Sequence, residues 1–98
     1  LVGRWKFDES SGTTAADDTG NGNTGTLTNG GTFATGQINN AVDLDGTNDY
    51  VDIANESNFD FERTNAFTLA AWVNRDTNGS RHHLLSKITN DIARTGYE

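Results

Sequence analysis

The stretch from Gly12 to Gly36 constrains the fold most, because it holds seven of the eleven glycines and only two large apolar side chains, Leu27 and Phe33. Such a stretch cannot form the apolar face of an amphipathic helix, and it predicts a long loop interrupted by one short strand at residues 26–28. Fourteen Thr, twelve Asn and ten Asp favour turns, whereas the helix formers Leu, Lys and Glu are scarce. We therefore expect an all-β fold. Disorder is the weaker alternative, since aromatic and β-branched clusters recur along the chain.

Alternation of apolar and polar residues predicts strands at both ends of the sequence. Residues 1–7 place Trp5 and Phe7 on one face and basic side chains on the other. Residues 82–88 offer a further strand, after a turn at residues 76–80.

The acidic segment from residue 41 to residue 53 predicts a β-hairpin. Two alternating runs flank the turn Gly46-Thr47-Asn48, with Val51 and Ile53 pointing inward and the carboxylates outward.

Residues 66–75 are apolar on both faces, which is typical of a central strand that is covered on each side. The preceding polar loop, residues 55–65, is expected to place Phe59 and Phe61 against the core.

Charge and composition exclude several functions. The 98 residues are only 33% apolar and have a net charge of −7, the wrong sign for neutralising the phosphates of nucleic acid or an anionic membrane. The charge is local: residues 1–62 sum to −9 and residues 63–98 to +2. The chain has no cysteine, so disulfide and thiolate chemistry are excluded, and no apolar run is long enough for a membrane span.

The loop from residue 15 to residue 25 is rich in hard oxygen donors. Carboxylates, amides and a hydroxyl alternate with glycines there, and Ca²⁺ prefers such ligands. The spacing does not match an EF-hand. The alternative is a series of hydrogen-bonded turns that needs no ion.

Several motifs occur in a distinctive order along nearly the whole chain, and together they resemble laminin-G-like (LamG-like) domains of the concanavalin A-like lectin/glucanase superfamily. These motifs are Val2 to Phe7 followed by Asp8-Glu9-Ser10-Ser11-Gly12, the loop Asp17 to Gly25, Gly36 with Asn40-Ala41, Leu44 to Val51, and Phe67 to Val73.

The resemblance implies an antiparallel jelly-roll β-sandwich that is usually extracellular, often binds carbohydrate or protein, and often holds structural calcium. It implies Asp17 as the first calcium ligand, with Asn21 and Asn23 next and Thr19 in a position where the family usually has serine. Family domains are longer, so we expect residues 1–98 to form a single, incomplete domain whose remaining strands follow Glu98.

Catalysis is not expected. Glucanases of this superfamily pair carboxylates on alternating positions of one strand. No glutamate here has such a partner, and the alternating Asp43 and Asp45 lie on the flank of the expected hairpin. His82 and His83 are adjacent, so on a strand they would point to opposite faces and could not readily share an ion.

Tyr50, beside the acidic turn, is the candidate for stacking on a sugar ring, whereas Trp5 and Trp72 are expected to pack in the core. Asn55 and Asn78 match the N-glycosylation acceptor pattern.

The sequence therefore predicts a non-catalytic, secreted or cell-surface module that binds a glycan or a partner protein and is stabilised by calcium. One alternative is a structural module of an extracellular fibre or adhesin stalk that binds other copies of itself. A less favoured alternative is a part of a glycan-processing enzyme.

Overall fold

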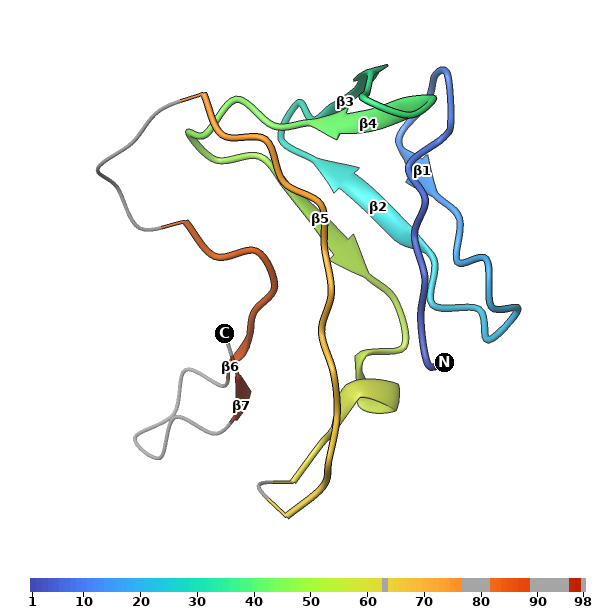
Figure 1. Cartoon of the computed structure of the whole chain (residues 1–98), viewed down its shortest axis with the longest axis vertical. Coiled ribbons are helices and arrows are strands. Elements are labelled where there is room, and N and C mark those ends of the chain that lie inside the picture. The colour runs from blue at the N-terminus through green and yellow to red at the C-terminus, as the bar shows by residue number, and fades with distance from the viewer. Residues whose placement is uncertain (63, 77–81, 89–95, 98) are drawn as a thin grey trace. The chain divides into compact units, whose positions relative to one another are not determined.

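The computed structural model describes residues 1–62, 64–76, 82–88 and 96–97 (Figure 1). The chain divides into two compact units, Leu1–Phe59 and Asp60–Glu98, and each is described by itself.

The first unit is built from five short antiparallel strands and a single 3₁₀ turn. One sheet has the order β1-β2-β5, and β3 pairs with β4 in a second sheet (Figure 1). The elements are β1 (Thr14–Ala15), β2 (Gly25–Thr28), β3 (Thr32–Thr35), β4 (Asn40–Asp43), β5 (Tyr50–Ile53) and the 3₁₀ helix η1 (Glu56–Phe59). The all-β class and the strand at residues 26–28 are thus confirmed. The prediction that the rest of residues 12–36 is loop is wrong, because β1 and β3 also lie in this stretch.

The core of the first unit is small and lies on the three-stranded sheet. Ala15 and Leu27 are its buried apolar residues. Gly25 pairs with Ala15 on one side and Ile53 on the other. A Cβ atom on Gly25 would lie 2.7 Å from Val51 Cγ1, so a residue with a side chain would displace its neighbours in the sheet.

The N-terminal segment keeps the predicted alternation, because Trp5 and Phe7 are half-buried while Arg4 and Lys6 are exposed. It does not form a full strand, because its β-type backbone pairing is limited to an isolated antiparallel bridge between Trp5 and Asp17. The ring of Trp5 packs against Phe59 with centroids 5.9 Å apart, which agrees with its expected packing role.

The predicted hairpin is wrong, although both of its strands form. β4 pairs with β3 and β5 pairs with β2, so the two strands belong to different sheets. The segment between them is a six-residue loop, in which Thr47 N donates to Asp45 Oδ1 at 2.7 Å and Asp45 N donates to Asp49 Oδ2 at 3.1 Å. These carboxylates stabilise a wide loop where a hairpin needs a tight turn.

In the second unit, residues 66–75 run as an extended segment with no strand assigned (Figure 1). Leu69, Trp72 and Val73 are 49%, 104% and 50% exposed. The prediction of a covered central strand, with Trp72 in a core, is therefore wrong for this structure. The physical reason is that no described strand pairs with this segment, so Trp72 is left exposed.

The rest of the second unit has few regular elements among its described residues. Phe61 stacks on Phe67 with centroids 4.9 Å apart. Of the strand expected at residues 82–88, the last two residues form β6 (Lys87–Ile88), which pairs with β7 (Gly96–Tyr97). Residues 77–80 of the expected turn lie outside the described part. Across the described ranges, no helix is long and apolar enough to cross a membrane.

Candidate functional site

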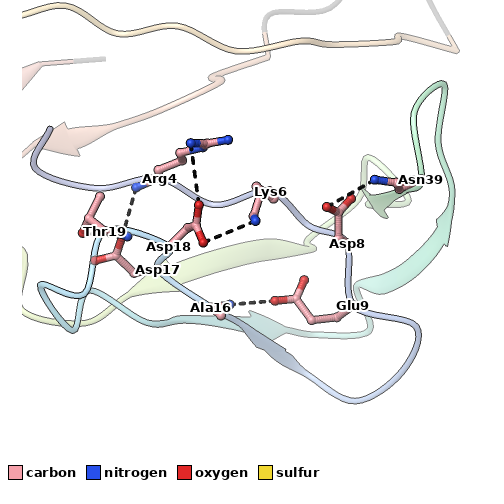
Figure 2. A network of polar contacts seen from close by, with 9 residues as sticks. All are labelled: Arg4, Lys6, Asp8, Glu9, Ala16, Asp17, Asp18, Thr19 and Asn39. Carbon is pink, nitrogen blue, oxygen red and sulfur yellow. Dashed lines mark hydrogen bonds and ion pairs between the residues drawn. The ribbon is translucent and has the colours of Figure 1, made fainter.

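The carboxylate of Asp17 organises the glycine-rich loop. Its Oδ1 accepts hydrogen bonds from Arg4 N at 3.1 Å, Thr19 N at 3.0 Å and Thr19 Oγ1 at 2.7 Å, and its Oδ2 accepts one from Asn23 N at 3.1 Å. Figure 2 shows Asp17 between Arg4 and Thr19. One side chain thus joins the N-terminal segment to both halves of the loop.

These hydrogen bonds also set the charge of Asp17. Desolvation raises the pKa of Asp17, but the hydrogen bonds from Thr19, Arg4 and Asn23 outweigh it and lower the pKa to about 2. Asp17 is therefore a carboxylate at neutral pH.

Asn23 is fully buried and connects three segments. Its Nδ2 donates to the carbonyl oxygen of Val2 at 2.8 Å, and its Oδ1 accepts from Asn58 Nδ2 at 2.7 Å. Its own carbonyl oxygen accepts from Trp5 Nε1 at 2.7 Å. A buried amide with its polar atoms paired in this way fixes the relative positions of the N-terminal segment, the loop and η1.

Thr19 and Asn21 complete the network. Thr19 Oγ1 accepts from Asn21 N at 3.2 Å. The side chain of Asn21 donates to the carbonyl oxygens of Leu1 at 3.2 Å and Val2 at 3.0 Å. The four residues predicted as calcium ligands therefore lie in one hydrogen-bonded cluster.

In the arrangement described, hydrogen bonds engage four of the five side-chain oxygens of Asp17, Thr19, Asn21 and Asn23. Ca²⁺ takes six to eight oxygens. Here both oxygens of Asp17 and the amide oxygen of Asn23 already accept hydrogen bonds, and the hydroxyl of Thr19 donates to Asp17. An ion at Asp17 Oδ1 would have to replace hydrogen bonds, because this oxygen already accepts three. Calcium binding stays a prediction, and the loop is held without it.

A second group of contacts holds the same segments together at the surface (Figure 2). Asp18 Oδ2 lies 3.6 Å from Arg4 Nη1, and Asp18 Oδ1 lies 3.3 Å from Lys6 Nζ. Glu9 Oε1 accepts from Ala16 N at 2.8 Å. The ion pairs are exposed to solvent and contribute little individually, but they show that these acids have structural partners.

A hollow of about 370 Å³ opens beside the cluster. Its lining residues are Leu1, Val2, Asn21, Asn23 and Asn58. No charged side chain lines it. The amide oxygens of Asn21 and Asn58 have no hydrogen-bond partner among the described residues and are on exposed side chains, so they can accept from a ligand.

Sequence reasoning missed Asn58, because nothing in the polar loop that contains it indicates a contact with Asn23, thirty-five positions earlier. The structure does not place Tyr50 in the lining of this hollow. Tyr50 is 49% exposed on β5, where it pairs with Thr28.

The remaining predicted positions are dispersed. The side chain of Asn55 donates to the carbonyl oxygen of Gly22 at 2.9 Å, so a glycan on its Nδ2 would disturb this bond. Asn78 lies outside the described residues. Asp43 ends β4 and Asp45 lies in the following loop, so the two do not share a strand face. His82 and His83 are exposed.

Comparison with protein-family models, curated proteins and solved structures gave no significant match, so the resemblance to laminin-G-like domains stays a prediction.

Proposed function

We propose that this chain is a non-catalytic, extracellular binding module whose hollow at Asn21 and Asn58 recognises a neutral, hydroxyl-rich ligand, a segment of a glycan. The observation that supports it best is the chemistry of the lining, which combines amide groups with apolar side chains and contains no charged side chain.

Sugar hydroxyls both donate and accept hydrogen bonds, and side-chain amides can pair with them in either direction. The free amide oxygens of Asn21 and Asn58 would accept from hydroxyls, while Leu1 and Val2 offer apolar contacts to the C–H faces of a sugar ring. The volume is near the lower end of the range of about 300–1,000 Å³ for ligand sites. It suits a short glycan segment better than a bulky ligand.

The hollow is also pre-organised. The buried amide of Asn23 fixes the segments that bear Val2 and Asn58, so binding a ligand would require little ordering of these lining residues. Nothing in the proposal depends on calcium. Tyr50 stays a proposed second contact, separate from the hollow.

A matched pair of substitutions tests the proposal. Val2→Trp fills the hollow while leaving the backbone carbonyl that Asn21 and Asn23 use, and Ile38→Trp adds the same ring at a position that is 80% exposed and outside the lining. On a glycan array, we expect the unmodified chain and Ile38→Trp to bind the same glycans and Val2→Trp to lose at least about tenfold in signal. Absence of signal for the unmodified chain, or equal binding by Val2→Trp, would refute the site.

A second candidate function is a structural module that binds other copies of itself. The extended, exposed segment of residues 66–75 favours it, because such a segment is a template for another strand.

A further inference from the structure

We propose that Asn29 is a site of spontaneous deamidation in the folded chain and that Asp49 promotes the reaction. The inference goes beyond glycan binding and does not depend on it, because neither residue lines the hollow. It rests on the Asn-Gly sequence at residues 29–30, on how loosely this pair is held, and on a carboxylate oxygen beside it.

The reaction is an attack of the backbone on a side chain. An asparagine followed by glycine is prone to it, because glycine has no side chain that shields its own nitrogen. Gly30 N forms a bond to Asn29 Cγ, the bond from Cγ to Nδ2 breaks, and Nδ2 leaves as ammonia with the proton that Gly30 N gives up. Water then opens the succinimide ring at either carbonyl carbon, which yields aspartate or isoaspartate at position 29.

The chain has three Asn-Gly pairs, and the structure distinguishes the two that it describes, residues 21–22 and 29–30. Four hydrogen bonds hold the first pair: one on Asn21 N, two on Asn21 Nδ2 and one on the carbonyl oxygen of Gly22. Within the described part of the chain, the atoms of the second pair make one, from Asn29 Nδ2 to the carbonyl oxygen of Asn48 at 2.9 Å. Ring closure must break such bonds, so the structure protects Asn21 more than Asn29.

Asp49 offers a proton acceptor at the same place. A Cβ atom on Gly30 would lie 3.4 Å from Asp49 Oδ1, so this oxygen lies beside the Gly30 backbone. It is buried and accepts no hydrogen bond from a described residue, whereas Oδ2 accepts one from Asp45 N at 3.1 Å. A carboxylate in this position can take the proton of Gly30 N directly or through one water, which makes the nitrogen a better nucleophile.

Conversion changes the contact between the turn after β2 and the loop after β4. The oxygen that replaces Asn29 Nδ2 cannot donate to the carbonyl oxygen of Asn48. The product also adds a negative charge next to the loop that bears Asp49, in a chain whose net charge is already −7. Deamidation would therefore weaken this contact.

Peptide mapping by mass spectrometry tests the proposal, because it quantifies aspartate and isoaspartate at each position. The unmodified chain is incubated at pH 7 in native buffer and, in parallel, in concentrated urea. In native buffer, we expect Asn29 to convert at least about tenfold faster than Asn21. In urea, which removes the hydrogen bonds and the carboxylate alike, the two should convert at similar rates.

A matched pair of variants tests the role of Asp49. Asp49→Asn keeps an oxygen that can accept from Asp45 N but removes the base, and Asp52→Asn removes the same charge from an exposed position of β5. We expect Asp49→Asn to slow conversion of Asn29 at least about tenfold and Asp52→Asn to leave it unchanged. The rate should also rise more steeply with pH in Asp49→Asn, because hydroxide must then remove the proton.

The rate at Asn21 reports on folding within each variant, since it rises if the cluster opens. Equal rates at Asn29 and Asn21 in native buffer, or a slower rate at Asn29, would overturn the proposal. An unchanged rate and pH dependence in Asp49→Asn would overturn the role of Asp49 and leave deamidation of Asn29 standing.

Discussion

Replacing Asn23 with alanine removes the side chain that joins the N-terminal segment, the loop and η1. That side chain is fully buried, donates to the carbonyl oxygen of Val2 at 2.8 Å and accepts from Asn58 at 2.7 Å. One hydrogen bond contributes about 0.5–1.5 kcal/mol net, and a buried group left unpaired costs more. Two lost bonds therefore predict that Asn23→Ala lowers the free energy of unfolding of the first unit by about 2–3 kcal/mol.

The nearly isosteric change Asn23→Asp is a sharper test. The carboxylate can still accept from Asn58, but its second oxygen faces the carbonyl oxygen of Val2, to which Asn23 now donates. It also places a negative charge in a buried position close to Asp17. We expect Asn23→Asp to be less stable than Asn23→Ala at pH 7. Burial and the nearby carboxylate raise the pKa of the introduced acid, so the difference should shrink as the pH falls toward about 4 and be smallest below it, where the protonated acid can donate again.

Urea unfolding followed by tryptophan fluorescence measures both variants. A Trp72→Phe background leaves Trp5, whose Nε1 donates to the carbonyl of Asn23, as the sole reporter. Asn48→Ala is the control, since Asn48 is exposed and its side chain makes no hydrogen bond with a described residue; it should change stability by less than about 0.5 kcal/mol. A loss in Asn23→Ala no larger than in this control, or an Asn23→Asp variant more stable than Asn23→Ala at pH 7, would refute the reasoning.

Acid should destabilise the first unit through Asp17. Its folded pKa of about 2 lies below the ordinary value of 3.8, so its stabilising contribution is complete above that value and is lost as the pH falls through about 2. Unfolding midpoints between pH 2 and 5 should therefore depend less on pH in Asp17→Asn, and an unchanged profile would contradict this. Gly25→Ala should cost about 1–3 kcal/mol, because its Cβ would lie 2.7 Å from Val51 Cγ1. Thr26→Ala, at the exposed neighbouring position, should lower the stability less, and an equal loss would argue against close packing around Gly25. Millimolar Ca²⁺ should leave the thermal midpoint within about 1 °C of that in EDTA. A saturable rise that Asp17→Asn removes would show that the loop rearranges around an ion.

Some strand positions could be predicted from alternation, but strand pairing could not. The strand at residues 50–53 has Val51 inward and Asp52 outward, and this period of two is local information. Pairing depends on which distant segment lies alongside. Phe33 lies in a stretch whose composition predicts a loop, but it belongs to β3, where it pairs with Val42 of β4. Because β4 pairs with β3, it does not form the expected hairpin with β5. Residues 66–75 show the same limit, since a two-sided apolar pattern predicts a covered strand without indicating what covers it.

For the candidate site too, the position of the residues could be predicted but their contacts could not. Asp17, Thr19, Asn21 and Asn23 could be placed together because they are in one short loop rich in oxygen donors. Their roles could not be predicted, because the partners come from elsewhere: the backbone of Val2 and the side chain of Asn58 lie twenty-one and thirty-five positions from Asn23. Residue types that suit a cation also suit backbone N–H groups, and only the three-dimensional partners distinguish these uses.

The central claim is that the hollow beside the cluster binds a neutral, hydroxyl-rich ligand, and a titration followed by ¹⁵N–¹H NMR tests it most directly. The chain would be titrated with the oligosaccharide that binds best on the array. The account predicts that the side-chain amide signals of Asn21 and Asn58, which line the hollow, shift and saturate together, while that of Asn48, outside it, stays in place. Shifts that leave Asn21 and Asn58 unchanged and gather around Tyr50 or another surface would contradict it.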